Sequence, residues 1–381
     1  MNSETSNQTM SHSFLGFGRS LIVDASGWGE ENTGLKVFCE CILAKFLRNP
    51  PKKYTELIVL IRAGADFQRL KKECPENVTF ETVSFKPIGI EKELWFLRNV
   101  RRVARCDFLS LSSYLPIFLF SRTKACIVHD LKYVEIPSFL NSKFKQGVFR
   151  IIMRWSINHA DRVFAVSEYT KSRVKQIYGR DDAVVTHEGM PSKFNAIEEN
   201  YQLPGKKYFL CVSEYRPHKN LHRTVQAFVD ANHDNSFALI IVGRDVTKLE
   251  EKFRSCVENG TLILKVNVND GQLGALYQKA HAFLYMSLYE GFGLPILEAQ
   301  KFGIPVLTAN STSTEEVAGS SCLLADPENT LEISRAISEL MKPGELCDDL
   351  TERGYKNIER FSWNKASLIL ADELTKVDYR I

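Results

Sequence analysis

Strand-like and helical segments alternate along almost the whole of this chain. Short runs rich in Val, Ile, Leu and aromatic residues predict buried strands. In the first half we predict strands at 20–24, 56–61, 78–83, 106–111, 125–129, 163–166 and 183–187, with helices near 34–48, 66–73, 91–104, 142–159 and 168–177. Such alternation is typical of an α/β fold with mostly parallel sheets.

A polar stretch, residues 191–207, divides this alternation into two halves. After it we predict strands at 208–213, 237–242, 261–265, 282–287 and 304–308, and helices at 220–232, 247–257, 271–279, 294–302 and 329–341. With 381 residues, the chain exceeds the size at which one hydrophobic core usually keeps growing. The sequence therefore predicts two successive doubly wound domains, with a ligand cleft between the carboxyl ends of their strands.

Residues 290–298, with the sequence EGFGLPILE, carry the clearest functional signal. The apolar run before them predicts a buried strand, Gly291 and Gly293 permit a tight turn, and the proline suits the first turn of a helix. Backbone amides at such a helix start attract anions, phosphate in particular. Glu290 lies on the turn and Glu298 lies one turn into the helix, so we expect both carboxylates to face one ligand.

This segment resembles the nucleotide-sugar signature of family four of the retaining glycosyltransferases, which have the two-domain GT-B fold. The resemblance implies that Glu290 lies beside the transferred sugar and that Glu298 anchors the ribose hydroxyls. It also implies that the donor meets the backbone of the turn, formed by Gly291, Phe292, Gly293 and Leu294. The amphipathic tail, 353–377, resembles the helix that crosses back onto the first domain in this fold.

A second segment, FLCVSEYRPHKNLHRTVQAF, resembles the family's diphosphate-binding strand and helix start. Lys219 matches the lysine that meets the donor phosphates, and Asn220 follows it in the expected place. A charge-assisted hydrogen bond of this kind contributes roughly 1.5–3 kcal/mol. We therefore expect Lys219 to bind the leaving diphosphate.

The chain departs from the family at the arginine that usually accompanies this lysine. One usual position, directly before the lysine, is occupied by His218, and the other, five residues earlier, by Glu214. Arg216 is the guanidinium nearby, and we expect it to bind the donor in place of the usual arginine. The sequence alone does not show this substitution.

The first half resembles the family more loosely. The segment 125–131 places His129 and Asp130 at the end of a buried strand, and the family has a matching histidine near the donor sugar. By this resemblance His129 positions hydroxyls and stabilises charge. Gly34 resembles the glycine that lets the first domain approach the donor phosphate, although Lys36 stands where a second glycine is common. A plain capping role for Gly34 explains the sequence equally well.

Two further segments resemble parts of the family that border the site. Ser167 has the pattern of an N-cap for the helix after it, in a passage that borders the acceptor or sugar pocket in the family. Residues 310–319 resemble a loop that closes over the nucleotide-binding helix, with Glu316 and Val317 in place of its acidic-valine pair. A glutamate replaces the usual proline before that pair.

Several competing chemistries lack their motifs. The chain has no GxGxxG between a strand and a helix, no P-loop and no HExxH, which argues against a dinucleotide dehydrogenase, a P-loop enzyme and a zinc protease. It also has no Asp-x-Asp, the metal-diphosphate motif of the other large glycosyltransferase fold. We therefore expect no metal and no cofactor, with lysine, helix dipole and backbone amides carrying the charge of the leaving group.

Composition bears on where the chain works. Its nine cysteines are scattered without a CxxC pair, and the polar first residues lack the apolar stretch of a signal peptide, which favours a cytoplasmic setting. The net charge of +3 is too small to argue for nucleic acid. Basic and aromatic residues cluster at 93–105 and 143–155, which is consistent either with contact to the anionic inner face of a membrane or with ordinary solvated helix faces.

The resemblance as a whole implies a retaining, metal-independent hexosyltransferase. We expect Glu290, His129 and Lys219 to carry catalysis on a nucleotide-sugar donor, and GDP-mannose is the leading choice because two segments resemble those of bacterial polysaccharide mannosyltransferases most closely. UDP-linked hexoses stay open. The expected acceptor is a saccharide on a lipid carrier, as in the synthesis of surface polysaccharide or O-antigen. Other enzymes of polysaccharide assembly are expected partners.

Two other classes of protein remain open. One is a GT-B enzyme with a different reaction, a sugar-nucleotide epimerase or a phosphorylase, and the other is a non-catalytic subunit that supports a partner transferase. The expected division of the chain is a disordered polar tail at 1–18, a first domain at 19–192, a linker at 193–207, a nucleotide-sugar domain at 208–360, and a C-terminal helix at 361–381 that packs on the first domain.

Overall fold

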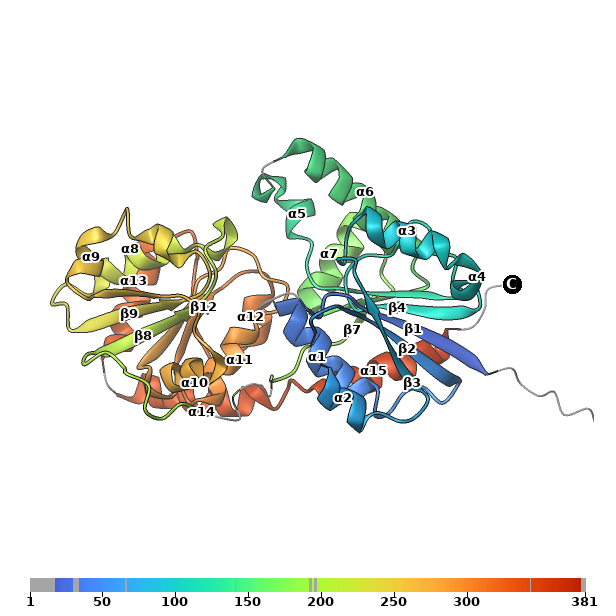
Figure 1. Ribbon diagram of the computed structural model, residues 1–381. Coiled ribbons are helices and arrows are strands. Elements are labelled where there is room, and N and C mark those ends of the chain that lie inside the picture. The colour runs from blue at the N-terminus through green and yellow to red at the C-terminus, as the bar shows by residue number, and fades with distance from the viewer. Residues whose placement is uncertain are drawn as a thin grey trace, which may run out of the picture.

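The computed structural model describes residues 18–29, 34–65, 67–140, 142–191, 194, 197–342 and 344–377. Figure 1 shows two α/β units side by side, each with a central sheet flanked by helices. The predicted fold class, two Rossmann-like doubly wound domains, is confirmed. The expected tail at 1–18, apart from its last residue, and part of the expected linker at 193–207 lie outside the described residues.

The first sheet is parallel and has the strand order β3-β2-β1-β4-β5-β6-β7. Its strands are mostly apolar because helices cover both faces of a parallel sheet, as the buried residues Leu21, Ile22 and Val23 of β1 illustrate. The strands are β1 (Arg19–Ala25), β2 (Tyr54–Arg62), β3 (Val78–Val83), β4 (Cys106–Ser110), β5 (Lys124–Val128), β6 (Arg162–Ala165) and β7 (Val184–Val185).

The helices of the first domain connect these strands. Helix α7 shows how local sequence sets their bounds: the Ser167 hydroxyl accepts a hydrogen bond from the Thr170 amide, as the predicted N-cap should, and Gly179 ends the helix with φ 72°. The helices are α1 (Gly34–Phe46), α2 (Gln68–Glu73), α3 (Ile90–Arg98), α4 (Val100–Val103), α5 (Lys132–Glu135), the 3-10 turn η1 (Pro137–Phe139), α6 (Lys143–His159) and α7 (Glu168–Tyr178).

The second sheet repeats this architecture in the order β10-β9-β8-β11-β12-β13. Its strands are β8 (Lys207–Val212), β9 (Phe237–Val242), β10 (Leu262–Lys265), β11 (Ala282–Tyr285), β12 (Val306–Ala309) and β13 (Leu323–Ala325). In both sheets the strand order reverses beside the first strand, between β1 and β4 and between β8 and β11. Ligands of doubly wound folds bind outside the carboxyl ends of the strands at such a switch point.

The helices of the second domain cover both faces of its sheet (Figure 1). They are the 3-10 turns η2 (Pro217–Lys219) and η3 (Val246–Leu249) and the helices α8 (Leu221–Ala231), α9 (Arg254–Glu258), α10 (Asp270–Lys279), α11 (Leu294–Lys301), α12 (Thr312–Ala318), α13 (Thr330–Met341) and α14 (Glu345–Ile358). Helix α15 (Trp363–Lys376) follows them in the sequence.

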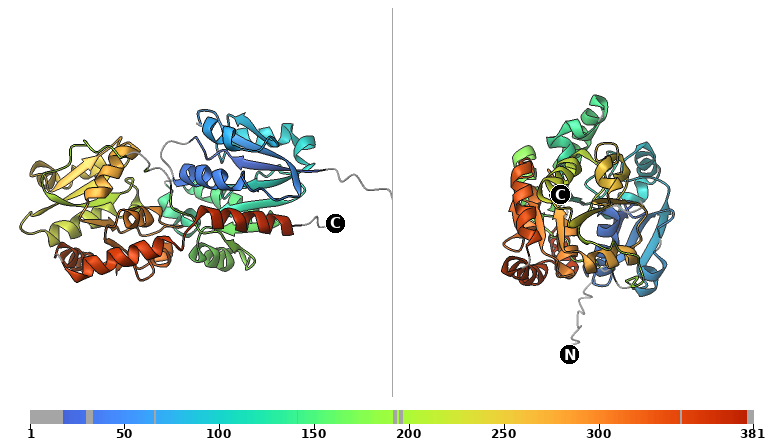
Figure 2. Two further views of the ribbon diagram at one scale, coloured as in Figure 1. Left: turned by 90° about the horizontal axis from the view of Figure 1, so that it is seen from below. Right: turned by 90° about the vertical axis from the view of Figure 1, so that its left-hand side faces the viewer.

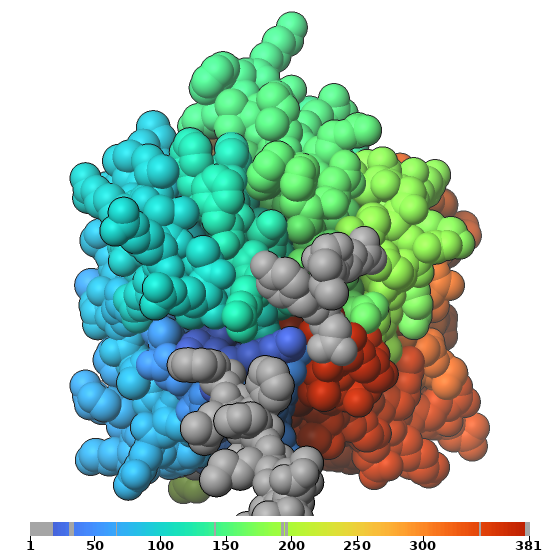
Figure 3. Space-filling view, turned by 90° about the vertical axis from the view of Figure 1, so that its right-hand side faces the viewer, coloured from blue at the N-terminus to red at the C-terminus, as the bar shows by residue number. Residues whose placement is uncertain are grey.

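The last helix, α15, returns to the first domain, which fits the predicted fold class. Figure 2 shows it lying along that domain, and Figure 3 shows the C-terminal residues beside those from the start of the chain. The Trp363 ring packs on Phe38 of α1 with centroids 5.4 Å apart, and Glu373 lies 3.4 Å from Arg162. These contacts make α15 a strap that joins the two domains.

Several predicted elements differ from those observed. Residues 310–319, predicted as a loop, contain helix α12, and the predicted helix at 247–257 is divided into η3 and α9. The helical tail 353–377 is divided between α14 and α15. Elements α5, η1 and β13 were not predicted, because each has three or four residues and too little periodicity to mark it. No helix among the described residues is long and apolar enough to cross a membrane.

Candidate active site

The predicted site residues lie at the carboxyl ends of strands from both sheets. Lys219 follows β8 and Glu290 follows β11, which are the two strands at the switch point of the second sheet. His129 follows β5 of the first sheet directly. The topology therefore brings the three residues expected to carry catalysis to the facing edges of the two domains, where a doubly wound fold binds its ligands.

The turn after β11 is built by glycine and held by a neighbouring helix. Gly293 has φ 121° and stands at the N-terminal end of α11, where an L side chain would be strained. The Ser313 hydroxyl, from α12, is 2.9 Å from the carbonyl oxygens of both Glu290 and Phe292. The Phe292 and Leu294 side chains are buried, and the expected contact of their backbone groups with the donor stays a prediction.

Glu290 forms a buried ion pair with Lys219. The ammonium Nζ lies 2.7 Å from Glu290 Oε1 and 3.3 Å from the Tyr285 hydroxyl. Burial alone would raise the pKa of Glu290, but the Lys219 charge and hydrogen bonds from Lys219 and Ser287 outweigh it and lower that pKa below its ordinary value. The lowered pKa keeps the Glu290 carboxylate ionised at neutral pH beside the Lys219 side chain.

Glu298 lies deeper than the sequence indicated. Its side chain is buried in α11, and the Tyr277 hydroxyl donates a hydrogen bond of 2.9 Å to its Oε2. This contact of its Oε2 does not show Glu298 facing the same ligand as Glu290. Its role as the ribose anchor stays a prediction.

The turn that carries Lys219 is fixed by Asn220. This residue has a left-handed backbone with φ 56°, which asparagine tolerates better than most residues. Its side-chain amide donates to the carbonyl oxygens of Met286, at 3.0 Å, and Pro327, at 2.7 Å. Asn220 thus ties the Lys219 turn to the end of β11. A direct contact with the donor stays a prediction.

The position of the usual arginine holds a neutral group. Burial and the charges of Lys132 and Lys219 lower the pKa of His218 to about 4, so His218 brings no positive charge at neutral pH. Arg216 is 54% exposed, with its Nε 3.6 Å from Glu214, which also pairs with Arg244. The structure places Arg216 in a surface pair, and its expected contact with the donor stays a prediction.

A cation that the sequence analysis missed lies on the first-domain side. Lys132 is the first residue of α5, and its Nζ is 3.0 Å from Asp130. Its charge lowers the pKa of His218, which places the ammonium near the Lys219 turn of the other domain. The ring of Phe139, just after α5, lies 5.5 Å from that of His218. Lys132 belongs to no motif by which the sequence analysis could have recognised it.

His129 is oriented by backbone groups of the first domain. Its Nε2 lies 2.8 Å from the Leu111 carbonyl oxygen, and its amide donates to the Ser113 hydroxyl at 3.1 Å. The Phe38 ring meets the imidazole edge-on, with centroids 4.5 Å apart. A carbonyl can only accept, so Nε2 carries a proton and Nδ1 faces the site.

Contacts across the domain boundary lie beside these residues. The Ser167 hydroxyl donates to the Gly291 carbonyl at 2.8 Å, joining the start of α7 to the turn after β11. Glu316 of α12 accepts from the amides of Glu168 and Tyr169 at 2.9 and 3.0 Å, and lies 2.8 Å from His187 Nε2. Glu316 therefore acts as a cap for a helix of the other domain, a role different from that of a closing loop.

Gly34 begins α1 at the surface, next to residues 30–33, which are outside the described part. A Cβ added there would meet nothing within 4 Å. The structure therefore shows no steric need for glycine at this place, and the expected approach of Gly34 to the donor phosphate stays a prediction.

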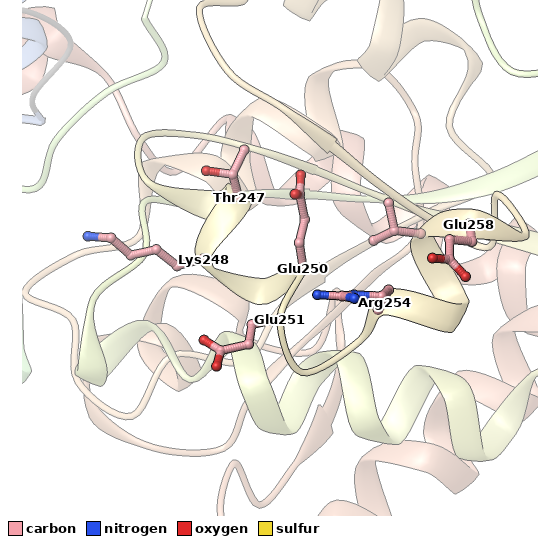
Figure 4. Close-up of a pocket in the computed structure, with 7 residues that line it drawn as sticks. Thr247, Lys248, Glu250, Glu251, Arg254 and Glu258 are labelled. Atoms are coloured by element: carbon pink, nitrogen blue, oxygen red, sulfur yellow. The ribbon is translucent and has the colours of Figure 1, made fainter.

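A hollow in the second domain, at η3 and α9, is separate from these residues (Figure 4). It is lined by Lys248, Arg254 and three glutamates, among other residues, and contains none of the predicted site residues. The mixture of charges favours neither an anion nor a cation. In the described ranges no three His, Cys, Asp or Glu side chains gather as they would around a metal ion. Metal independence stays a prediction.

Comparisons with known proteins bear on the family and the fold of this chain. Residues 193–357 match the family model of "Glycosyl transferases group 1". The O-antigen chain mannosyltransferase B of Escherichia coli is 28% identical over 302 residues, which cover 74% of this chain and 77% of that protein. The O-antigen chain mannosyltransferase RfbU of Salmonella typhimurium is 26% identical over 269 residues, covering 67% and 70%.

Among solved structures, HepE of Anabaena, in complex with UDP and glucose, superposes with a TM-score of 0.72. The match covers 94% of this chain and 100% of that one at 18% sequence identity, which supports the fold. The resemblance found in the sequence is confirmed by the family match and by the relatives. The chain has the GT-B fold, and its residues 193–357 match the family model of the group 1 glycosyl transferases.

Proposed function

We propose that this protein transfers mannose from GDP-mannose to a saccharide acceptor on a lipid carrier, with retention of the anomeric configuration, during O-antigen or related polysaccharide synthesis in the cytoplasm. The buried Lys219–Glu290 pair at 2.7 Å is the observation that supports donor chemistry at this place. The choice of mannose rests on the two O-antigen mannosyltransferases that this chain resembles.

The pair provides for the two charges that transfer creates. As the bond between the anomeric carbon and the diphosphate oxygen breaks, negative charge grows on the phosphate and positive charge on the sugar. Lys219 stabilises the first by a charge-assisted hydrogen bond, and the Glu290 carboxylate orients the sugar and stabilises the second. Amides at the start of α11 add to the diphosphate side.

The acceptor hydroxyl attacks on the face that the diphosphate leaves. Its oxygen forms the new bond to the anomeric carbon, and its proton passes to the departing phosphate oxygen. Such a route needs no protein nucleophile and no metal ion. His129, held across the domain boundary from Glu290, positions the reacting sugar from the first domain.

We also propose that α6 carries the enzyme to the anionic inner face of the membrane. Figure 1 shows α5 and the start of α6 projecting from the first domain beside the gap between the domains. Phe144 and Ile151 on α6 are 80% and 66% exposed. Exposed basic side chains accompany them: Lys143, Lys145, Arg150 and Arg154. Apolar side chains flanked by cations suit a bilayer with anionic headgroups, where a lipid-linked acceptor lies.

Thermal unfolding with a panel of nucleotides tests the donor. A ligand that binds only the folded form raises its stability, so GDP and GDP-mannose should raise the melting temperature more than UDP, ADP or their sugars do. A larger shift with the UDP compounds would overturn the choice of GDP. Incubation with GDP-mannose and acceptor should then release GDP, in EDTA as well as without it, and NMR of the product should show the donor's anomeric configuration.

The same incubation distinguishes the other classes. Release of free GDP with an epimerised sugar and no acceptor would indicate an epimerase, and a requirement for orthophosphate would indicate a phosphorylase. Binding without turnover would indicate a non-catalytic subunit.

Sedimentation with vesicles tests the membrane contact. The protein should bind vesicles that contain phosphatidylglycerol and not vesicles of phosphatidylcholine alone. The double variant Phe144→Glu/Ile151→Glu should lose this binding. Leu331→Glu, at an exposed apolar position on α13 of the other domain, serves as its control. Equal sedimentation of the double variant and the native protein would exclude α6 as the contact.

A further inference from the structure

A buried carboxylate that the sequence analysis did not single out lies beside His129. Glu188 follows β7 and is 7% exposed. Its Oε1 lies 3.8 Å from His129 Nδ1, which is longer than a direct hydrogen bond. Within the described part of the chain, the imidazole is the one polar partner that the structure shows for this carboxylate. A buried carboxylate with so little compensation is costly to fold, which favours a ligand as its missing partner.

The surroundings place Glu188 inside the proposed site. The negative charge of Glu290 contributes to the pKa of Glu188, which burial raises and His129 partly lowers. The charge of one group shifts the pKa of another in this way only when the two groups lie close together. Glu188 therefore lies in the same region of the interior as Glu290, next to the imidazole of His129.

Contacts of the residues before and after Glu188 hold its backbone in place. On one side, His187 lies 2.8 Å from Glu316 of the second domain. On the other, a Cβ at Gly189 would come within 2.3 Å of the Trp363 amide nitrogen, so this glycine lets the chain pass against the start of α15. A side chain between two such anchors keeps its direction, which suits recognition of a ligand.

The gap between Glu188 and His129 has the chemistry of a hydroxyl site. His129 Nε2 is engaged by the Leu111 carbonyl, which leaves Nδ1 for the space in front of Glu188. One sugar hydroxyl can donate to the Glu188 carboxylate, and a neighbouring hydroxyl can donate to the unprotonated Nδ1 of His129. A phosphate oxygen would be repelled by two nearby carboxylates, Glu188 and Glu290, so the place fits a neutral polyhydroxyl ligand.

We propose that Glu188 is a sugar-recognition residue whose carboxylate accepts a hydrogen bond from one hydroxyl of the transferred hexose, beside His129. This inference rests on the proposed function, because it assumes a hexose donor in the cleft. It assigns the first domain a share in choosing the sugar, whereas the nucleotide and diphosphate lie with the second domain.

Variants of Glu188, each combined with analogues of the donor, test the proposal. Glu188→Gln and Glu188→Ala should lower kcat/KM for GDP-mannose about 10- to 100-fold, as loss of a hydrogen bond to a charged group does. In a set of GDP-mannose analogues that each lack one hydroxyl, one analogue should lose activity with the native enzyme but lose little more with Glu188→Ala. Such non-additivity identifies the hydroxyl that Glu188 contacts.

Binding of GDP, which lacks the transferred hexose, separates this proposal from the proposed function. Glu188→Gln and the exposed control Glu199→Gln should both bind GDP as the native protein does. If the native protein does not bind GDP or turn over GDP-mannose, the proposed function fails. If it does, and every analogue loses equal activity in native and variant proteins, or Glu188→Gln transfers mannose at the native rate, the role of Glu188 is wrong.

Discussion

The carbonyl oxygen of His129, in the first domain, lies against the α-carbon of Gly291 in the second. A Cβ built on Gly291 would come within 1.7 Å of that oxygen. Glycine at this position lets the two domains meet beside His129 and Glu290. The position therefore couples the arrangement of the domains to the distance between these two residues.

Gly291→Ala should impair transfer without impairing nucleotide binding. The added methyl group overlaps a backbone oxygen, so the domains or the turn must shift. We expect kcat to fall about 10²-fold, since a displacement of about 1 Å between reacting groups has that effect. Steady-state kinetics measures kcat, and calorimetric titration with GDP measures binding.

Gly205→Ala is the matched control, because a Cβ there meets nothing within 4 Å. Its kcat should equal that of the native enzyme. A Gly291→Ala variant with native kcat would show that the contact with His129 does not matter for transfer.

Glu290 and Lys219 should act as one unit. Glu290→Ala and Lys219→Ala are each expected to lower turnover by about 10²-fold or more, as loss of a preorganised electrostatic group does. The double variant should be little worse than either single variant, because each removes the partner of the other. Rates of GDP release under saturating donor measure this cycle.

The surface pair of Lys342 and Glu339, at 2.8 Å, offers the comparison. Lys342→Ala should leave turnover unchanged, since exposed pairs contribute little. Near-native rates in both site variants would defeat the assignment of the site, and fully multiplicative losses would show that the two groups act separately.

Lys132 should supply a second cation for the donor diphosphate. Its Nζ is held 3.0 Å from Asp130, and its charge, like that of Lys219, lowers the pKa of His218. We expect Lys132→Met to raise the KM for GDP-mannose about 10- to 100-fold, the effect of losing one charge-assisted hydrogen bond. Lys132→Arg, which keeps the charge, should retain most of the affinity.

A variant of Arg216 tests whether this surface guanidinium contacts the donor. Arg216→Met should change the KM less than Lys132→Met does, because Arg216 is 54% exposed and paired with Glu214. A larger effect of Arg216→Met would mean that Arg216 moves to the donor, as the sequence analysis expected.

His218 should make stability depend on pH below neutrality. Its pKa is lowered from 6.5 to about 4 in the folded state, so the unfolded chain binds more protons between these pH values. The contribution is fully present above 6.5 and is lost as the pH falls toward 4, amounting to about 3 kcal/mol at most. Urea unfolding at pH 7 and pH 5 measures the loss.

His218→Gln removes the titrating group and should lose less free energy of unfolding between these two pH values than the native protein does. His233→Gln, at an exposed position, should behave as the native protein. An equal loss in His218→Gln and native protein would show that other groups account for the acid sensitivity.

Local sequence predicted the elements whose burial is uniform. The run FALIIV was predicted as a strand at 237–242, and β9 spans Phe237–Val242 with all six residues buried. Helix α12 was missed because its segment, rich in Ser and Thr, has the composition of a loop, and the Ser313 and Glu316 contacts that make it useful come from other elements.

Local sequence also predicted the turn after β11, since glycines, a proline and an acidic residue directly after a strand are typical of a passage from strand to helix. The same reasoning did not find Glu188 or Lys132. Neither belongs to a spacing that repeats along the chain, and each gains its meaning from residues more than fifty positions away.

The sequence by itself determined most of the strands and longer helices, their division into two sheets, and the turn that carries Glu290, because hydrophobic period, glycine and proline act over a few residues. Only the tertiary structure decided that Glu298 is buried, that His218 is neutral, and that Glu188 faces His129 without a close partner. The charge and hydrogen bonding of a buried side chain depend on every group that surrounds it, and parallel sheets bring those groups together from distant parts of the chain.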